Sequence, residues 1–393
     1  MRESKSAPLT EIDERSPTGT PPTASVSQGA SILIASNGTV GRMGSAVTEL
    51  VVLFGGRSAE HDISCVTARH VIDAMDRSRH TLTLVGIDRD GLWHLSDAAD
   101  DELSATGPQI EASELLGARV GTGAVVLPLL HGPLGEDGTI QGLLELVDLP
   151  YVGSGVLGSA LAMDKAMAKT VTGAVGIAQA AYLVVTENDF AAGSSAEEAI
   201  AHRIGETLGF PCFVKPANMG SSVGVSRVDE PAEVLDAVRL ALTYDRVVVV
   251  EEAIVGREIE VAVLGGADPI ASVPGEIIPG DRFYSYADKY LDGRSRTLVP
   301  ADLDPEAAEA ARQLALEAFR ALRCEGLARC DFFLPDDGRG LLLNEVNTMP
   351  GFTPISMYPK MMQASGVPYP EIIERLIDLA VERHASRRRR VDH

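Results

Sequence analysis

Apolar runs and amphipathic segments alternate along most of the chain. The first convincing run covers residues 49–54 and ends in Gly55-Gly56, after which apolar residues recur at helical spacing from Ile63 to Met75. A strand, a glycine turn and a helix form the opening unit of a parallel α/β domain. Similar patterns predict strands at residues 81–87, 123–130, 210–216, 247–252 and 258–264, and helices at residues 140–147, 163–169, 196–208, 305–322 and 370–384. The last of these strands alternates polar and apolar residues, as a half-exposed strand does.

Two further apolar segments lie near the C-terminus, at residues 329–333 and 341–346. The residues between them, 335–340, are rich in proline, aspartate and glycine. Short strands joined by such a turn predict an antiparallel hairpin.

This hairpin carries charged side chains at its centre. Side chains two residues apart on a strand share a face, so Glu345 points the same way as Asn347, and Arg329 the same way as Asp331. Burial of such groups is costly unless each finds a counter-ion or a metal, so the set is either a paired structural network or a cation site. The oxygens of Asp331, Glu345 and Asn347 suit a hard ion such as Mg²⁺ or Mn²⁺.

Composition places the chain among soluble α/β proteins. Its 393 residues are enough for two or three domains, and 45% of them are hydrophobic. The formal charge of −22 repels nucleic acids and anionic membranes, so a phosphate-bearing ligand requires a local basic pocket. The four cysteines have neither zinc nor redox spacing, which favours reduced thiols in a cytoplasmic protein, and no apolar window is long enough to insert into a membrane.

Both ends of the chain differ in composition from the rest. Residues 1–48 are rich in serine, threonine, proline and glycine, and we expect a disordered extension without a secretory signal. We hypothesise that Met43 is the true initiator, which the N-terminal mass of the natural protein would test. Residues 385–393 are expected to form a tail, in which Arg387 to Arg390 are solvated.

A loop of small residues, Gly220 to Gly224, lies between two predicted strands. Its backbone N–H groups and hydroxyls are suited to phosphate, although a plain hairpin turn explains the loop equally well. It is not a P-loop, because no Lys-Ser/Thr pair follows and the next element is a strand. Lys215 on the incoming strand and Lys165 favour an anionic partner, because lysines in apolar surroundings require one.

Several other polar residues remain ambiguous on pattern alone. Glu251 and Glu258 could accept from a nucleotide base or ribose, or form a solvated rim. Ser58 and Glu60 at the first helix start are typical of a capping arrangement. Residues 279–296 resemble a mobile polar loop, so the aromatic side chains there, including Tyr290, could be surface residues.

Taken together, these segments resemble the ATP-grasp ligases, and among them the D-alanine–D-alanine ligases, from about Val51 to Leu379. The resemblance depends on separated motifs at residues 55–61, 131–138, 163–165, 215–224, 289–290, 329–331 and 344–351. It implies three α/β domains with ATP between the central and C-terminal ones. We expect an N-terminal Rossmann-like domain at 49–153, a central ATP-grasp domain at 154–251 and a C-terminal ATP-grasp domain at 252–384.

The resemblance also implies roles for individual residues. Two Mg²⁺ or Mn²⁺ ions would be held by Asp331, Glu345 and Asn347. ATP would be bound by Lys165, Lys215, Ser221, Ser222, Glu251, Glu258 and Lys289. The two D-alanines would contact Glu60, His131, Lys289, Ser356 and the Met357 amide. Catalysis would involve Glu60, Ser221 and Tyr290 as a hydrogen-bonded triad, and Arg329 and the Gly351 amide as oxyanion donors.

The implied reaction has two steps and serves peptidoglycan precursor synthesis in the cytoplasm. The carboxylate of one D-alanine takes the γ-phosphoryl group of ATP, and the amine of a second D-alanine then displaces phosphate from the acyl phosphate. Lys289-Tyr290 follows the dipeptide-forming pattern, because related D-alanine–D-lactate ligases generally lack that tyrosine. The alternatives are a D-lactate or other carboxylate–amine ligase, and a silent nucleotide-binding protein. A homodimer is expected.

Overall fold

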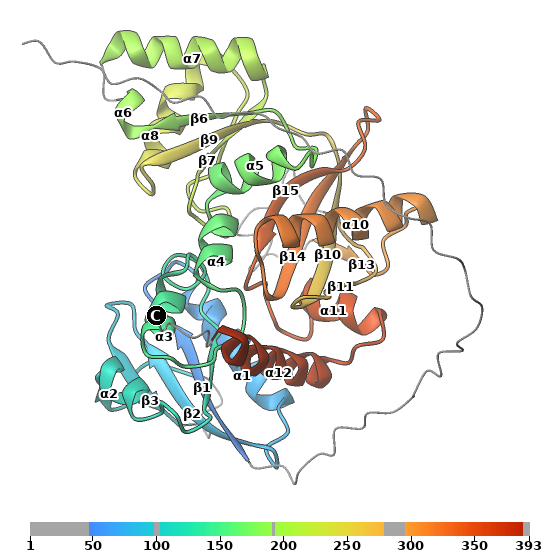
Figure 1. Ribbon diagram of the computed structural model, residues 1–393. Coiled ribbons are helices and arrows are strands. Elements are labelled where there is room, and N and C mark those ends of the chain that lie inside the picture. Colours follow the sequence, from blue (N-terminus) through green and yellow to red (C-terminus); the bar gives the residue numbers. More distant parts are fainter. Residues whose placement is uncertain (1–46, 98–102, 191–192, 279–294, 388–393) are drawn as a thin grey trace, which may run out of the picture. The chain divides into compact units, whose positions relative to one another are not determined.

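The computed structural model describes residues 47–97, 103–190, 193–278 and 295–387, which contain three β-sheets (Figure 1). Several sequence predictions lie outside these ranges. They are the N-terminal extension with Met43, the polar loop with Lys289 and Tyr290, and Arg388 to Arg390 of the tail. Among the residues described, no helix has the length and apolar character needed to cross a membrane.

The first sheet begins the parallel α/β unit predicted from the sequence. Its order is β4 (Gln109–Ile110), β3 (Trp93–Ser96), β2 (His80–Ile87), β1 (Thr48–Gly55) and β5 (Val125–Pro128). Strand β1 is parallel to β2 and β5, whereas β3 and β4 extend the edge antiparallel. The helices of this part are α1 (His61–Ala74), α2 (Ala112–Gly117) and α3 (Thr139–Leu146).

The second sheet is antiparallel and four-stranded. Its order is β6 (Tyr182–Thr186), β9 (Val247–Glu252), β7 (Cys212–Pro216) and β8 (Ser226–Val228). One face packs against α7 (Ser194–Leu208) and α8 (Val234–Leu242), with α6 (Glu187–Phe190) and the turn η1 (Pro231–Glu233) nearby. The other face packs against α5 (Lys165–Ala174).

The prediction that residues 163–169 belong to a single helix is wrong. The structure has two helices there, α4 (Val156–Met163) and α5, which meet at Asp164. The backbone of Asp164 is extended and its carboxylate accepts the Met167 N–H at 2.9 Å. Such capping starts a new helix, and Lys165 is therefore its first residue.

The third sheet carries the predicted hairpin. Its order is β13 (Arg296–Leu298), β12 (Gly275–Ile278), β10 (Gly256–Gly265), β14 (Gly326–Pro335) and β15 (Leu342–Asn347), with β11 (Ile270–Ala271) paired to β10. Strands β14 and β15 are antiparallel neighbours, so the hairpin prediction is confirmed. Helices α10 (Pro305–Ala321), α11 (Met357–Ala364) and α12 (Tyr369–Arg387) pack on this sheet, and α4 and α5 contact its strand β15.

The prediction of a half-exposed strand at residues 258–264 is wrong. Every residue from Ile259 to Leu264 is buried. Ile259, Val261 and Val263 pack in the cluster that contains α10, and Ala262 and Leu264 pack in the one that contains α11 and α12. Helices cover both faces of this central strand, so polar alternation did not indicate exposure.

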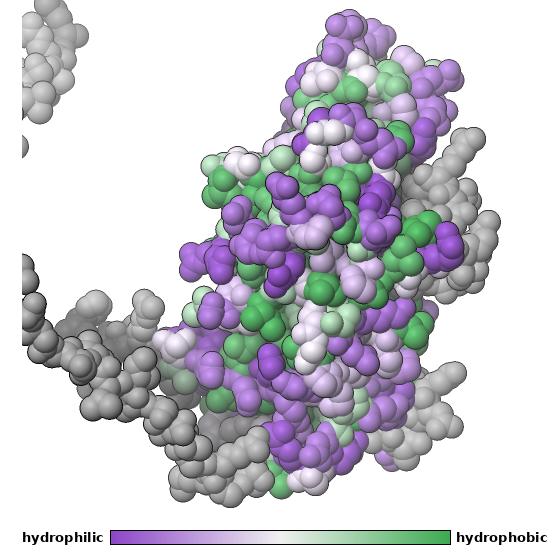
Figure 2. All heavy atoms as spheres, turned by 90° about the vertical axis from the view of Figure 1, so that its right-hand side faces the viewer, coloured by the Kyte–Doolittle hydropathy of each residue, from purple (hydrophilic) through white to green (hydrophobic). Residues whose placement is uncertain are grey.

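Helix α12 joins the first sheet to the third. Ile373 and Leu376 of α12 belong to the same apolar cluster as Val71 of α1 and Leu127 of β5. The N-terminal and C-terminal parts therefore share a core. On the face shown in Figure 2, hydrophilic side chains separate small apolar groups, in keeping with the charge of −22.

Candidate active site

The β14–β15 hairpin brings four predicted side chains onto one face. Asp331 lies opposite Glu345, and Arg329 lies opposite Asn347. Arg329 donates to both carboxylate oxygens of Asp331 at 2.7 Å, and the Asn347 amide donates to Asp331 Oδ2 at 2.9 Å. A shift in register follows directly after Asp331, and such bulges redirect side chains near functional sites. The charged side chains of the hairpin therefore form a paired network, which is one of the two alternatives that the sequence left open.

Glu260 of β10 belongs to this network, and the sequence analysis missed it. Glu260 lies opposite Asp331 across the sheet, and its Oε1 is 3.3 Å from Arg329 Nε. Burial alone would lower the pKa of Arg329, but Asp331 and Glu260 outweigh burial and raise it well above its ordinary value. The sequence contains a pattern that could have identified Glu260, because Glu258 and Glu260 are two residues apart on a strand and therefore share a face.

Glu251 forms a second charged cluster with two lysines. Its Oε2 accepts from Lys215 Nζ at 2.6 Å, and its Oε1 lies 3.1 Å from Lys169 Nζ. Burial raises the pKa of Glu251, but Lys215 and then Lys169 outweigh burial and bring it to about 2. The solvated-rim interpretation of Glu251 is wrong, because only 3% of the residue is exposed. The sequence analysis placed Lys169 on a helix but gave it no role.

Lys165 connects the glycine-rich loop to the hairpin. Its Nζ donates to the Met219 carbonyl at 2.6 Å and lies 3.9 Å from Glu345 Oε2. Within the loop, Ser221 and Ser222 have φ values of 49° and 59°, a left-handed conformation that is uncommon for residues other than glycine. The loop connects β7 to β8 as predicted.

Glu60 meets this loop at the start of α1. Ser221 Oγ donates a hydrogen bond to Glu60 Oε1. A Cβ atom at Gly220 would lie 2.6 Å from Glu60 Oε2, and one at Gly132 would lie 2.8 Å from the same oxygen. A side chain at either position would therefore displace the Glu60 carboxylate. The capping interpretation is wrong for Glu60, whose side chain makes no cap hydrogen bond.

The loop after β5 places His131 beside the segment that follows β15. His131 Nδ1 lies 3.1 Å from the Met349 carbonyl, and its Nε2 lies 3.1 Å from Thr67 Oγ1. Burial lowers the pKa of His131, against the opposing effect of Glu60. Ser58 Oγ donates to the His131 carbonyl at 2.7 Å, so the same loop also contacts the start of α1.

The remaining predicted residues lie at the start of α11. Ser356 precedes that helix and Met357 is its first residue. A Cβ atom at Gly351 would lie 3.2 Å from Ser356 Oγ, so Gly351 is close to this helix start. Helix N-termini present unpaired backbone N–H groups, which suit a carboxylate.

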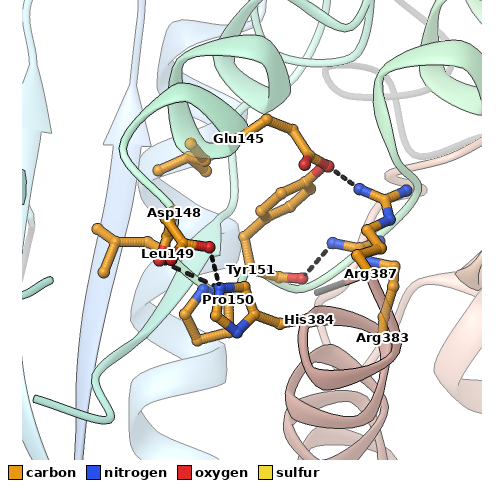
Figure 3. Close-up of a pocket in the computed structure, with 9 residues that line it drawn as sticks. Glu145, Asp148, Leu149, Pro150, Tyr151, Arg383, His384 and Arg387 are labelled. Carbon is orange, nitrogen blue, oxygen red and sulfur yellow. Dashed lines mark hydrogen bonds and ion pairs between the residues drawn. The ribbon is translucent and has the colours of Figure 1, made fainter. Parts of the chain in front are cut away.

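A pocket of about 180 Å³ lies apart from these residues (Figure 3). Figure 3 shows Glu145 and Tyr151 facing Arg387 and Arg383 of α12, and none of the predicted site residues lines this pocket. Arg383 donates to the Tyr151 carbonyl at 2.6 Å and also to that of Gly153. This region joins α12 to the N-terminal part.

Comparison with known proteins identifies the family. The model of the D-ala D-ala ligase N-terminus matches residues 49–154, and that of the C-terminus matches residues 171–378. The chain belongs to the D-alanine–D-alanine ligase family. A D-alanine–D-alanine ligase of Geobacillus kaustophilus (strain HTA426) is 46% identical over 357 residues, covering 86% of this chain and 96% of that protein.

Solved structures of this ligase family have the same fold. The D-alanine–D-alanine ligase of Coxiella burnetii aligns with a TM-score of 0.72 at 35% identity, covering 86% of this chain and 95% of that one. The VanG D-Ala:D-Ser ligase of Enterococcus faecalis aligns with a TM-score of 0.72 at 32% identity, covering 85% of this chain and 100% of that one. The predicted ATP-grasp ligase fold is therefore confirmed.

Proposed function

We propose that this chain joins two D-alanines into D-alanyl-D-alanine at the expense of ATP, through an acyl phosphate, with the residues described above. The observation that best supports this proposal is the position of Lys165. Its Nζ lies between the Met219 carbonyl and Glu345, so the glycine-rich loop adjoins the carboxylates of the hairpin. Phosphate-binding and cation-binding groups would then face one another, as phosphoryl transfer from ATP requires.

ATP phosphates would be held by Lys165, Lys215 and the N–H groups and hydroxyls of Ser221 and Ser222. A positive charge at each phosphate offsets repulsion between ATP and the carboxylate that attacks it. Glu251 and Glu258 are proposed to contact the adenine and ribose. The ion pairs of Glu251 with Lys215 and Lys169 support a location of Glu251 close to the phosphate-binding lysine Lys215.

Asp331, Glu345 and Asn347 would hold two divalent cations, Mg²⁺ or Mn²⁺. Their oxygen donors fit such ions, and their opposition across β14 and β15 brings them together. Among the residues described, no group of three or more His, Cys, Asp or Glu side chains is placed to hold a metal, so the Asn347 amide and substrate phosphates would complete the ligand set. Bound cations would neutralise charge on the transferred phosphoryl group.

The first D-alanine would place its ammonium group against Glu60 and lie near His131. Its carboxylate oxygen forms a bond to the γ-phosphorus, and the bond to the β-phosphate oxygen breaks to release ADP. The second D-alanine then attacks the acyl carbonyl through its amine, and a tetrahedral oxyanion forms. Arg329 and the Gly351 amide would donate to that oxyanion, and its collapse expels phosphate.

The second D-alanine would be bound through its carboxylate by Ser356, the Met357 amide and Lys289. We propose that Tyr290 completes a hydrogen-bonded triad with Glu60 and Ser221. The hydrogen bond from Ser221 to Glu60 supports the described part of this triad. A closed loop over the site would exclude water and protect the acyl phosphate from hydrolysis.

The test is to incubate the purified protein with Mg-ATP and D-alanine and to measure ADP and the mass of the product. We expect D-alanyl-D-alanine in equal amount to ADP. L-alanine, D-lactate and D-serine serve as alternative acceptors. Failure of D-alanine to stimulate ADP release would refute the proposal.

Three wider features are also proposed. The domain boundaries are 49–153, 154–251 and 252–384, the protein is a homodimer, and it works in the cytoplasm on peptidoglycan precursors. The presence of four free cysteines supports a reducing compartment. Sedimentation velocity would test the homodimer.

A further inference from the structure

Glu136 is a buried carboxylate without a role in the reaction described above. Its Oε1 accepts the Gly132 N–H at 2.8 Å, and its Oε2 accepts the Met349 N–H at 3.3 Å. Gly132 lies only four residues away, whereas Met349 lies 213 residues away in the segment that follows β15. One carboxylate therefore joins two loops that are distant in the sequence.

Both loops end beside proposed reacting groups. Gly132 follows His131 and lies against Glu60, which would bind the first D-alanine. Met349 lies two residues before Gly351, whose amide would donate to the oxyanion. The distance between the two loops therefore influences the distance between the first substrate and the oxyanion donor.

A second contact supports the same connection. The Met349 carbonyl lies 3.1 Å from His131 Nδ1, while the Met349 N–H is bound by Glu136. The Met349 peptide groups are thus held on both sides by residues of the loop after β5. Burial, and then the nearby Glu60, raise the pKa of Glu136 to about 8, and the hydrogen bonds from the Gly132 and Met349 N–H groups oppose that rise.

We propose that Glu136 is a positioning residue that holds His131 and Glu60 at the working distance from the Gly351 amide. The inference rests on the proposed function of these three residues. It predicts that changes at Glu136 affect the first D-alanine and the coupling of ATP use to dipeptide formation. A misplacement of about 1 Å is enough to reduce a rate about 100-fold.

The experiment compares Glu136→Gln and Glu136→Leu in the full chain. Gln retains one acceptor and we expect kcat/KM for the first D-alanine to fall about 10-fold, with a rise in KM, whereas Leu retains none and we expect a fall of about 100-fold. The ADP released per dipeptide should rise above one in both variants, since a poorly aligned acyl phosphate is lost to water. Partial rescue by Gln relative to Leu indicates that hydrogen bonding matters.

Asp137→Asn is the matched control. Asp137 accepts the Leu134 and Thr139 N–H groups at 2.8 and 2.9 Å, so its hydrogen bonds stay within the same loop. A purely structural role would lower the folded fraction and hence kcat, without changing KM or the ADP-to-dipeptide ratio. An unchanged KM and ratio at Glu136, or equal changes in Asp137→Asn, would overturn the inference.

The wild-type protein separates the two possible failures. If it forms no dipeptide from D-alanine and Mg-ATP, the proposed function fails. If it forms dipeptide while the Glu136 variants behave like Asp137→Asn, only the positioning role fails.

Discussion

Replacement of Glu251 by Gln is expected to destabilise the protein strongly. Glu251 is 3% exposed and lies 2.6 Å from Lys215 Nζ and 3.1 Å from Lys169 Nζ. Loss of one partner from a buried ion pair costs about 3–5 kcal/mol, because it leaves an uncompensated charge. The pKa of Glu251 is about 2, compared with an ordinary value of 4.5. This difference corresponds to about 3 kcal/mol of stabilisation of the ionised carboxylate in the folded state.

Urea denaturation at pH 7 would measure the change in the free energy of unfolding. The matched control is Glu252→Gln on the same strand, because Glu252 pairs at the surface with Arg339 at 2.7 Å. Surface pairs contribute about 1 kcal/mol or less, so this control should unfold almost as the wild type does. The double variant Glu251→Gln with Lys169→Met removes one unpaired lysine and should recover part of the loss.

The dependence on pH gives a second check. The pKa of Glu251 is lowered on folding, so its contribution is complete above about pH 4.5 and is lost as the pH falls towards about 2. The difference in stability between wild type and Glu251→Gln should therefore shrink with acidification. A loss below about 1 kcal/mol at pH 7, or a difference that stays constant with pH, would refute this electrostatic argument.

Three further variants test other parts of the structure. Asp331→Asn should lower turnover by about 100-fold or more with a modest loss of stability, because Glu260 remains beside Arg329; near-normal activity at limiting Mg²⁺ would remove Asp331 from the cation site. Lys165→Met should raise the KM for ATP about 10-fold, and an unchanged KM would exclude phosphate binding by this lysine. Arg383→Met should lower the free energy of unfolding by about 3 kcal/mol, because it leaves the carbonyls of Tyr151 and Gly153 without the Arg383 donor. The KM values of the folded enzyme should stay constant.

Local patterns predicted the parts of the fold that depend on nearby residues. The β14–β15 hairpin was predicted because its strands are adjacent in sequence and a turn-rich segment joins them. Strand β1 and helix α1 followed from hydrophobic spacing in the same way. The division between α4 and α5 was missed, although the capping carboxylate of Asp164 was the signal.

The errors concern burial, which depends on distant parts of the chain. Strand β10 has polar residues in alternation, but α10 covers one of its faces and α11 and α12 the other. In the sequence, Glu251 resembles a solvent-exposed residue at the end of a strand. In the structure it is paired with Lys169 of α5. No local pattern carries this information, because residues from separate elements supply the covering groups and counter-charges.

The resemblance to known ligases added what patterns could not. It proposed that Glu60 and Ser221 act together, and the structure places a hydrogen bond between them across 161 residues. It did not assign Glu136 or Glu260. The contact of Glu136 becomes apparent only when the loop after β5 meets the segment that follows β15, and that of Glu260 only when β10 pairs with β14.

The two roles open to Glu251 predict different effects of Glu251→Gln on the KM for ATP. If Glu251 contacts adenine, its replacement by Gln weakens nucleotide binding and raises the KM for ATP. If it only balances Lys169 and Lys215, the same replacement leaves two positive charges that attract the phosphates, and the KM for ATP does not rise. The global charge of −22 repels ATP at a distance, so these local charges decide its affinity. Initial rates at varied ATP for folded Glu251→Gln, with Glu252→Gln as control, therefore separate base recognition from charge balance.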